Sequence, residues 1–150
     1  MNRRIFSRIA GVAVLAAGLG GCAGMDSMGS AASLYQQLGG TDAVSKLAGN
    51  MVNSSMKDPR LSGLLGKVNP SAATPKVADQ MCAALGGGCK APFSDQQVAA
   101  AADRLSPDQK AAVSQNFGSS LNSVTSNPAL REAVTKSLGS KMGGILGALV

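Results

Sequence analysis

The sequence predicts one all-α domain behind an N-terminal export segment. A length of 150 residues suits a single domain and is too short for two. Hydrophobic residues make up 45% of the chain and aromatic residues only 3%, so a core must be built from Ala, Leu, Val and Met, which favour helices. Helix-capping residues followed by proline recur along the chain, and no run is typical of a strand. We therefore expect five or six helices.

The N-terminus has the pattern of a bacterial secretory signal. Three arginines in the first eight residues precede an apolar run over 9–19, and the run ends in Leu19-Gly20-Gly21-Cys22. The run is about half of the roughly 20 residues that a membrane-spanning helix needs. Small residues before a cysteine resemble a lipobox, in which Cys22 becomes the lipid-bearing first residue after cleavage. The alternative is an ordinary signal with an incidental cysteine.

The predicted organisation has three parts. Residues 1–21 are the signal peptide, residues 22–33 are the lipidated cysteine and a flexible tether of small residues, and residues 34–150 are the helical domain. Ala23 stands where an inner-membrane retention signal would place Asp, so we expect a lipid anchor at the periplasmic face of the outer membrane. Without residues 1–21 the net charge falls from +6 to +3, and the basic residues are scattered. Nothing indicates nucleic-acid binding.

Helix boundaries follow from the capping residues. Thr41-Asp42 predicts a helix over 42–56, and Asp58-Pro59 predicts another start. The remaining predicted starts are Thr74-Pro75 for 75–85, the capping box of Ser94 and Gln97 for 95–104, the capping box of Ser106 and Gln109 for 107–124, and Asn127-Pro128 for 128–149.

Apolar residues at helical spacing predict the core faces. They are Ala43, Val44, Leu47, Met51 and Val52 in the first helix, Ala111, Val113, Phe117 and Leu121 in the fourth, and Leu130, Val134, Leu138 and Met142 in the fifth. Gly139, Gly143 and Gly147 recur every four residues and permit another backbone to pack closely. A membrane-touching tail over 143–150 is the alternative to such packing.

Cys82 and Cys89 suit a disulfide in an exported protein. Gly86-Gly87-Gly88 lies between them and lets the chain end a helix and fold back. A two-cysteine metal site is the alternative, but the chain has no His to complete it.

Catalytic patterns are absent from the sequence. Without His there is no Ser-His-Asp triad, and the usual haem ligand is missing as well. Ser54 and Lys57 have the S-x-x-K spacing, yet no S-D-N or K-T-G motif follows. We therefore do not expect an enzyme.

Four segments together resemble group 1 truncated haemoglobins. LYQQLGG at 34–40 is similar to the LY-x-x-LGG that opens the family, and DPRL at 58–61 matches the motif after its first long helix. DQMCAALGG at 79–87 resembles the segment that ends in GGP, and Phe93-Ser94 stands where the family has Tyr-Thr. The resemblance covers nearly the whole mature domain and implies a two-over-two helical fold with haem between two helix pairs.

The family's haem-handling residues carry over as aliphatic ones. The proximal His position falls at Ala102, the aromatic pair that ends the first long helix becomes Met51-Val52, and the Phe at the haem edge corresponds to Leu64 or Leu65. Gln80 lies on the distal helix, out of clear register with the family's distal Gln. These six residues define a degenerate haem pocket. A few hundred Å³ left empty would cost several kcal/mol at about 24 cal/mol per Å³, so we expect the space to be collapsed or filled by another apolar ligand.

Two functions follow from this sequence. The first is a lipid-anchored binding or structural module without a cofactor, whose partner is an envelope protein or an apolar small molecule. The alternative is a haem protein for oxygen or redox chemistry with a ligand other than His. The candidate axial ligands are Met51, Met56, Met81, Tyr35 and reduced Cys82.

Overall fold

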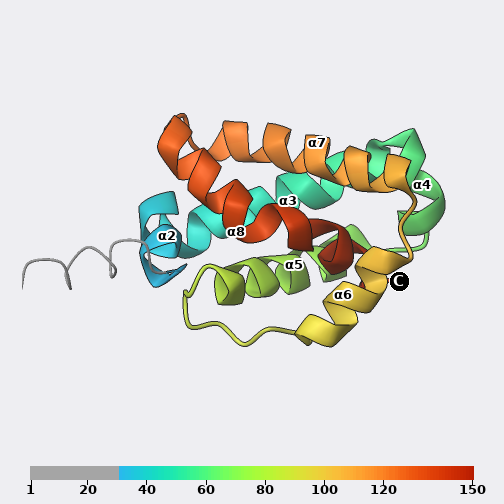
Figure 1. Cartoon of the computed structure of the whole chain (residues 1–150), viewed down its shortest axis with the longest axis horizontal. Helices are drawn as coiled ribbons and strands as arrows, with labels where there is room; N and C mark the ends of the chain where they lie inside the picture. The colour runs from blue at the N-terminus through green and yellow to red at the C-terminus, as the bar shows by residue number, and fades with distance from the viewer. Residues whose placement is uncertain (1–30) are drawn as a thin grey trace, which may run out of the picture.

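The computed structural model describes residues 31–150, and their side chains from Leu34 onward. Cys22, the signal peptide and most of the tether lie outside the described residues. The described part is all-α, as predicted, with seven helices rather than five or six (Figure 1). They are α2 (Ala31–Leu38), α3 (Gly40–Lys57), α4 (Pro59–Leu65), α5 (Pro70–Ala84), α6 (Asp95–Asp103), α7 (Pro107–Val124) and α8 (Pro128–Gly147).

Four of the predicted helix starts are confirmed. The side chain of Asp58 accepts a hydrogen bond from the backbone N–H of Arg60 at the start of α4, and Asn127 caps α8 in the same way. Ser94 and Ser106 form complete capping boxes at α6 and α7. These starts were predictable because each cap depends on residues within one helical turn.

Two predicted starts are wrong. Helix α3 begins at Gly40 after Gly39, whose φ of 115° suits glycine, and Thr41 binds the Tyr35 hydroxyl instead of capping. Helix α5 begins at Pro70, where Asn69 accepts a hydrogen bond from Ser71 N–H, so Pro75 lies inside the helix. The sequence has Asn-Pro at this earlier point, and a proline at the first helical position needs no N–H partner.

Helix α2 was not predicted as a helix, although its residues carry the LYQQL motif. It is a short amphipathic helix with Leu34 and Leu38 buried against the rest of the domain. Eight residues rarely form a stable helix alone, so its packing contributes the stability that the local sequence lacks.

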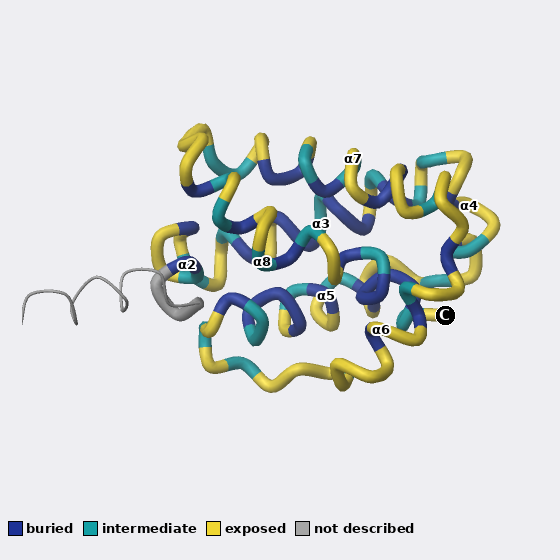
Figure 2. The backbone as a smooth tube through the Cα atoms, in the orientation of Figure 1, coloured by how far each residue is buried: buried dark blue, intermediate teal, exposed yellow. Residues whose placement is uncertain are grey.

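The core is aliphatic and runs through the centre of the molecule (Figure 2). The predicted face of α8 is confirmed, since Leu130, Val134, Leu138 and Met142 are all buried. On α7 the prediction is wrong at one position, because Ala112 is buried and Ala111 is exposed. The buried residues 113, 117, 120 and 121 lie on the same face as residue 112, which explains the difference.

Helix α8 runs through the middle of the molecule, with α7 on one side and α5 and α6 on the other (Figure 1). Helices α6 and α8 pack backbone against backbone. A Cβ atom built on Gly144 would lie 2.0 Å from the carbonyl oxygen of Val98, and one on Gly147 would lie 3.1 Å from that of Ala101. The prediction of close backbone packing at glycines therefore holds for Gly147 but not for Gly143 or Gly139. Gly143 meets the side chain of Leu105 at 3.0 Å, and Gly139 meets only Thr135 of its own helix.

The C-terminal segment packs inside the domain. Residues 144–147 are buried. Within residues 31–150, no helix combines the length and the apolar character needed to cross a membrane.

Candidate functional site

The six residues of the degenerate haem pocket lie in different surroundings. Met51, Val52 and Leu65 are buried in the aliphatic core, each with no more than 1% of its surface exposed. Ile145 and Leu146 of α8 belong to the same buried core. These three positions therefore belong to a packed core.

The other three residues lie apart from that core group. Leu64 is half-buried and lines a surface groove beside α4 and α5. Gln80 is buried, and its side-chain oxygen accepts a hydrogen bond from the backbone N–H of Phe93 at 3.0 Å. Ala102 is half-buried on α6, and its methyl group offers no atom for a metal. Gln80 thus supports the α5–α6 loop.

The groove at Leu64 combines apolar walls with positive charge. It has a volume of about 430 Å³, and its apolar side chains include Leu64, Val68, Leu149 and Val150. Lys67 and Lys76 add two cations, and no Asp or Glu side chain lines it. We call it the amphiphile groove. Val150 is 59% exposed, so part of its apolar wall faces solvent.

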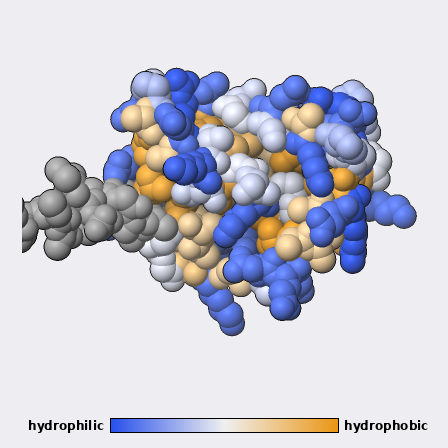
Figure 3. Space-filling model, in the orientation of Figure 1, coloured by the Kyte–Doolittle hydropathy of each residue, from blue (hydrophilic) through white to orange (hydrophobic). Residues whose placement is uncertain are grey.

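Hydrophilic side chains interrupt the apolar surface elsewhere. Figure 3 shows hydrophobic areas on the drawn face as small patches separated by hydrophilic residues. Isolated apolar patches are normal on a soluble surface. The amphiphile groove is distinguished by its concavity and its two lysines rather than by apolar surface alone.

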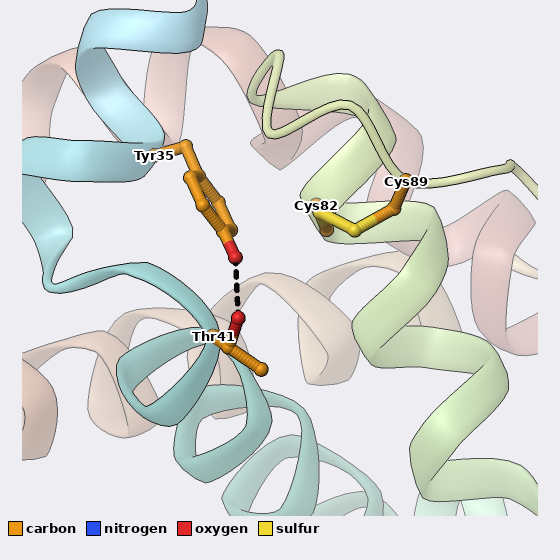
Figure 4. The surroundings of a disulfide bond; sticks show 4 residues. All are labelled: Tyr35, Thr41, Cys82 and Cys89. Carbon is orange, nitrogen blue, oxygen red and sulfur yellow. Dashed lines mark hydrogen bonds between the residues drawn. A yellow bond between two sulfur atoms is a disulfide. The ribbon is translucent and has the colours of Figure 1, made fainter.

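The predicted disulfide is confirmed. Cys82 and Cys89 are bonded, with a Cα–Cα distance of 5.7 Å, and Gly86 and Gly88 between them have φ of 76° and 79°. Figure 4 shows Tyr35 beside this bond, with its hydroxyl directed to Thr41. With Cys82 in the disulfide, its sulfur is not a free thiolate for a metal.

Gly87 completes this contact with α2. A Cβ atom at Gly87 would lie 2.6 Å from the Cys82 sulfur and 2.7 Å from the Tyr35 ring. Only glycine therefore fits between the disulfide and the aromatic ring. The Tyr35 hydroxyl lies 2.7 Å from Thr41 Oγ1, which links α2 to the first turn of α3.

An ionic cluster joins the start of α4 to α7. Arg60 donates to both carboxylate oxygens of Asp58, at 3.0 and 2.8 Å, and to the side-chain oxygen of Gln115. Asn116 also donates to Asp58 at 3.1 Å. The Arg60 side chain is the main reason why the pKa of Asp58 is lowered to about 2, and the Arg60 N–H and Asn116 contribute further. This cluster explains the DPRL motif as a structural element.

Metal ligands do not cluster in the part of the chain that the structure describes, where no group of three or more Cys, Asp or Glu side chains could hold an ion. No protein-family model matches the chain, and no curated protein or solved structure matches it either.

Sequence reasoning missed most of the amphiphile groove. It identified Leu64, but not Lys67, Lys76 or Val150. These residues come from α4, the following loop, α5 and the C-terminal segment, which are brought together only by the fold. No local pattern marks them.

Proposed function

We propose that this protein is a lipid-anchored protein of the bacterial cell envelope whose helical domain binds an anionic amphiphile, such as a long-chain carboxylate. The domain is a truncated-globin-like two-over-two fold that has lost haem binding. Anchoring depends on Cys22 and its lipobox-like surroundings. The observation that carries the ligand class is the amphiphile groove, with its apolar walls, two lysines and no acidic side chain.

The order of the helices supports the globin-like part of the proposal. The helices follow the order that the motif resemblance implies. The long helix α3 is followed by the short α4 after DPRL, by α5, which ends before Gly86-Gly87, by a short α6, and by the two long helices α7 and α8. Helix α3 packs against both α5 and α7, and α7 packs against α8.

The residues do not fit haem. Ala102 and Val52 offer neither an iron ligand nor a hydrogen bond to a bound gas. Met51 and Met81 have fully buried side chains in the core, and the Tyr35 hydroxyl is paired with Thr41. The carbonyl of Val98 on α6 lies against Gly144 of α8, so the two backbones are in contact at this point. A binding function without haem is the better match.

The amphiphile groove suits a ligand with an apolar chain and an anionic head. Leu64, Val68 and Leu149 provide apolar contact, and burial of a ligand chain there gains about 25 cal/mol per Å² of apolar surface. Lys67 and Lys76 provide a charge for a carboxylate or phosphate head. Lys67 and Lys76 are the charged side chains of the lining, and they favour an anionic head group.

Two titrations test this proposal on the mature polypeptide, residues 22–150, with Cys22→Ser to prevent lipidation. Dodecanoate should bind saturably below its micelle concentration, and Leu64→Asp should abolish binding by adding an anion to the wall. Ser62→Asp, on the same helix and outside the groove lining, is the matched control. Haemin should give no saturable one-to-one Soret spectrum. A haemin complex at one-to-one stoichiometry would overturn the loss of haem binding.

The anchor has a separate test. Labelling of growing cells with a radioactive fatty acid should mark the full-length protein, and Cys22→Ala should remove the label. Outer-membrane fractions should contain the labelled protein. Label that persists in Cys22→Ala would refute anchoring at Cys22 and leave the ligand proposal unaffected.

A further inference from the structure

A second groove lies between α3 and α7, and its lining is entirely polar. Its volume is about 620 Å³. The residues that line it are Asn50, Asn53, Ser54, Lys57, Ser119, Ser120 and Ser123. Lys57 is the one charged side chain among them, and no large apolar side chain takes part. We call it the polar groove. It shares no residue with the amphiphile groove.

The helical repeat explains why these residues meet. Residues 50, 53, 54 and 57 form one stripe on α3, and residues 119, 120 and 123 form one on α7. The helices run antiparallel, since Asn50 bonds Ser123 while Asp58 bonds Asn116. Serine side chains are too short to fill the space between two helices, so a hollow remains.

Hydrogen bonds hold part of this lining in place. Asn50 Nδ2 donates to Ser123 Oγ at 2.8 Å, and Ser123 Oγ donates to the backbone oxygen of Ser120 at 2.6 Å. This chain of two bonds fixes the amide of Asn50 at one end of the groove. Lys57 lies two helical turns away at the other end.

A buried hydroxyl in this lining has no partner. Ser120 is only 3% exposed, and within the described residues its Oγ makes no hydrogen bond. Buried polar atoms in native proteins are nearly always paired, so such a group indicates a partner that the protein itself does not supply. Ser55, next to Ser54 on α3, has a second unpaired hydroxyl. Ser55 is fully buried and does not line the polar groove, so Ser120 is the unpaired hydroxyl that bears on this site.

We propose that the polar groove binds a small anionic polyol of the sugar-phosphate class. Lys57 supplies the positive charge for the phosphate. The amides of Asn50 and Asn53 and the serine hydroxyls both donate and accept, which suits a ligand with several hydroxyl groups. The S-x-x-K spacing of Ser54 and Lys57 thus places two binding groups on one face of α3.

Calorimetric titration tests the ligand class with three probes: glucose 6-phosphate, glucose and inorganic phosphate. Glucose 6-phosphate should bind saturably, at least about tenfold more tightly than either part alone, because both the charge and the hydroxyl groups contribute. The protein is the mature polypeptide with Cys22→Ser. Equal affinity for glucose 6-phosphate and inorganic phosphate, or no saturable heat with any probe, would overturn the proposal.

Two variants locate the site. Lys57→Gln should weaken glucose 6-phosphate binding about tenfold, whereas Lys110→Gln, an exposed lysine of α7 outside the groove lining, should leave it unchanged. Ser120→Ala should weaken binding without lowering the melting temperature, because its hydroxyl has no partner in the free protein. Equal loss in Lys57→Gln and Lys110→Gln would refute the location. Binding of dodecanoate is independent of these residues, so the two proposals fail separately.

Discussion

The molecule has two helix pairs that meet through small residues, and they differ in how closely they pack. At α6–α8 the glycines 144 and 147 bring backbone against backbone, and the surface grooves beside this contact are smaller, about 270 and 420 Å³. At α3–α7 serines 119, 120 and 123 leave a groove of about 620 Å³. The hydroxymethyl side chain of serine keeps two helices apart, and its hydroxyl needs a hydrogen-bond partner when buried. The hydrogen atom of glycine has neither effect. Small size alone therefore does not determine whether a helix pair closes.

The largest effect on the free energy of unfolding should come from disrupting the close contact between α6 and α8. Gly144→Ala places a methyl group 2.0 Å from the Val98 carbonyl oxygen, and backbone has to move to accommodate it. We expect a loss of about 3 kcal/mol in the free energy of unfolding, measured with urea.

Gly118→Ala on α7 is the control for Gly144→Ala. Nothing lies within 4 Å of its added Cβ, so it should gain about 0.5–1 kcal/mol from reduced backbone freedom in the unfolded chain. A similar gain in stability for both variants would show that helix propensity, not close packing, governs these glycines.

The next largest effect concerns the loop that leads into α6. The bond between Cys82 and Cys89 joins residues seven apart, and chain-entropy arguments assign it about 2.5 kcal/mol. Replacing both cysteines by serine should lower stability by this amount. A reducing agent should lower the melting temperature of the parent protein and leave that of the double variant unchanged. A reductant effect that persists in the double variant would contradict this account.

An intermediate effect on stability comes from Asp58, which links the start of α4 to α7. Its pKa is about 2 in the folded protein against an ordinary value of 3.8, so the folded state binds the proton less well than the unfolded chain. This contribution is present above pH 4 and is lost as the pH falls from about 4 to about 2. Asp58→Asn should therefore flatten the fall of the melting temperature across this range. An unchanged profile would show that other carboxylates determine it.

The smallest effect should come from the unpaired hydroxyl of the open pair. Ser120→Ala should raise stability by about 0.5 kcal/mol, because alanine favours the helix and no hydrogen bond is lost. Ser106→Ala is the contrasting control, since it removes a capping bond to Gln109 and should cost about 1 kcal/mol. If Ser120→Ala and Ser106→Ala lower the free energy of unfolding by the same amount in urea, the Ser120 hydroxyl has a hydrogen-bond partner in solution.

Local sequence predicted local structure well. The caps at Asp58, Ser94, Ser106 and Asn127 were predictable because each needs only a few neighbouring residues. The cysteine pair was predictable from its glycine-rich spacer. Thr74-Pro75 misled the prediction because it repeats the signal that Asn69-Pro70 carries five residues earlier.

Features assembled from distant segments were not predictable. Which glycines contact α6 depends on the rotation of α8, and that rotation is set by Val134, Leu138 and Met142 in the core. Both grooves combine residues more than 60 positions apart, such as Leu64 with Val150 and Asn50 with Ser123. The spacing within each helix was visible in the sequence, but the pairing of helices was not.

The position of α2 has a mechanical consequence. It lies at the opposite end of the molecule from the C-terminus (Figure 1), and its Tyr35 ring contacts Gly87 within the loop closed by Cys82 and Cys89. A pulling force applied at the N-terminus would pass along the backbone through α2 into α3, and the Tyr35 ring would resist the separation of α2 from the closed loop. Under the proposed anchoring at Cys22, the amphiphile groove beside Val150 would lie at the end of the domain away from the membrane.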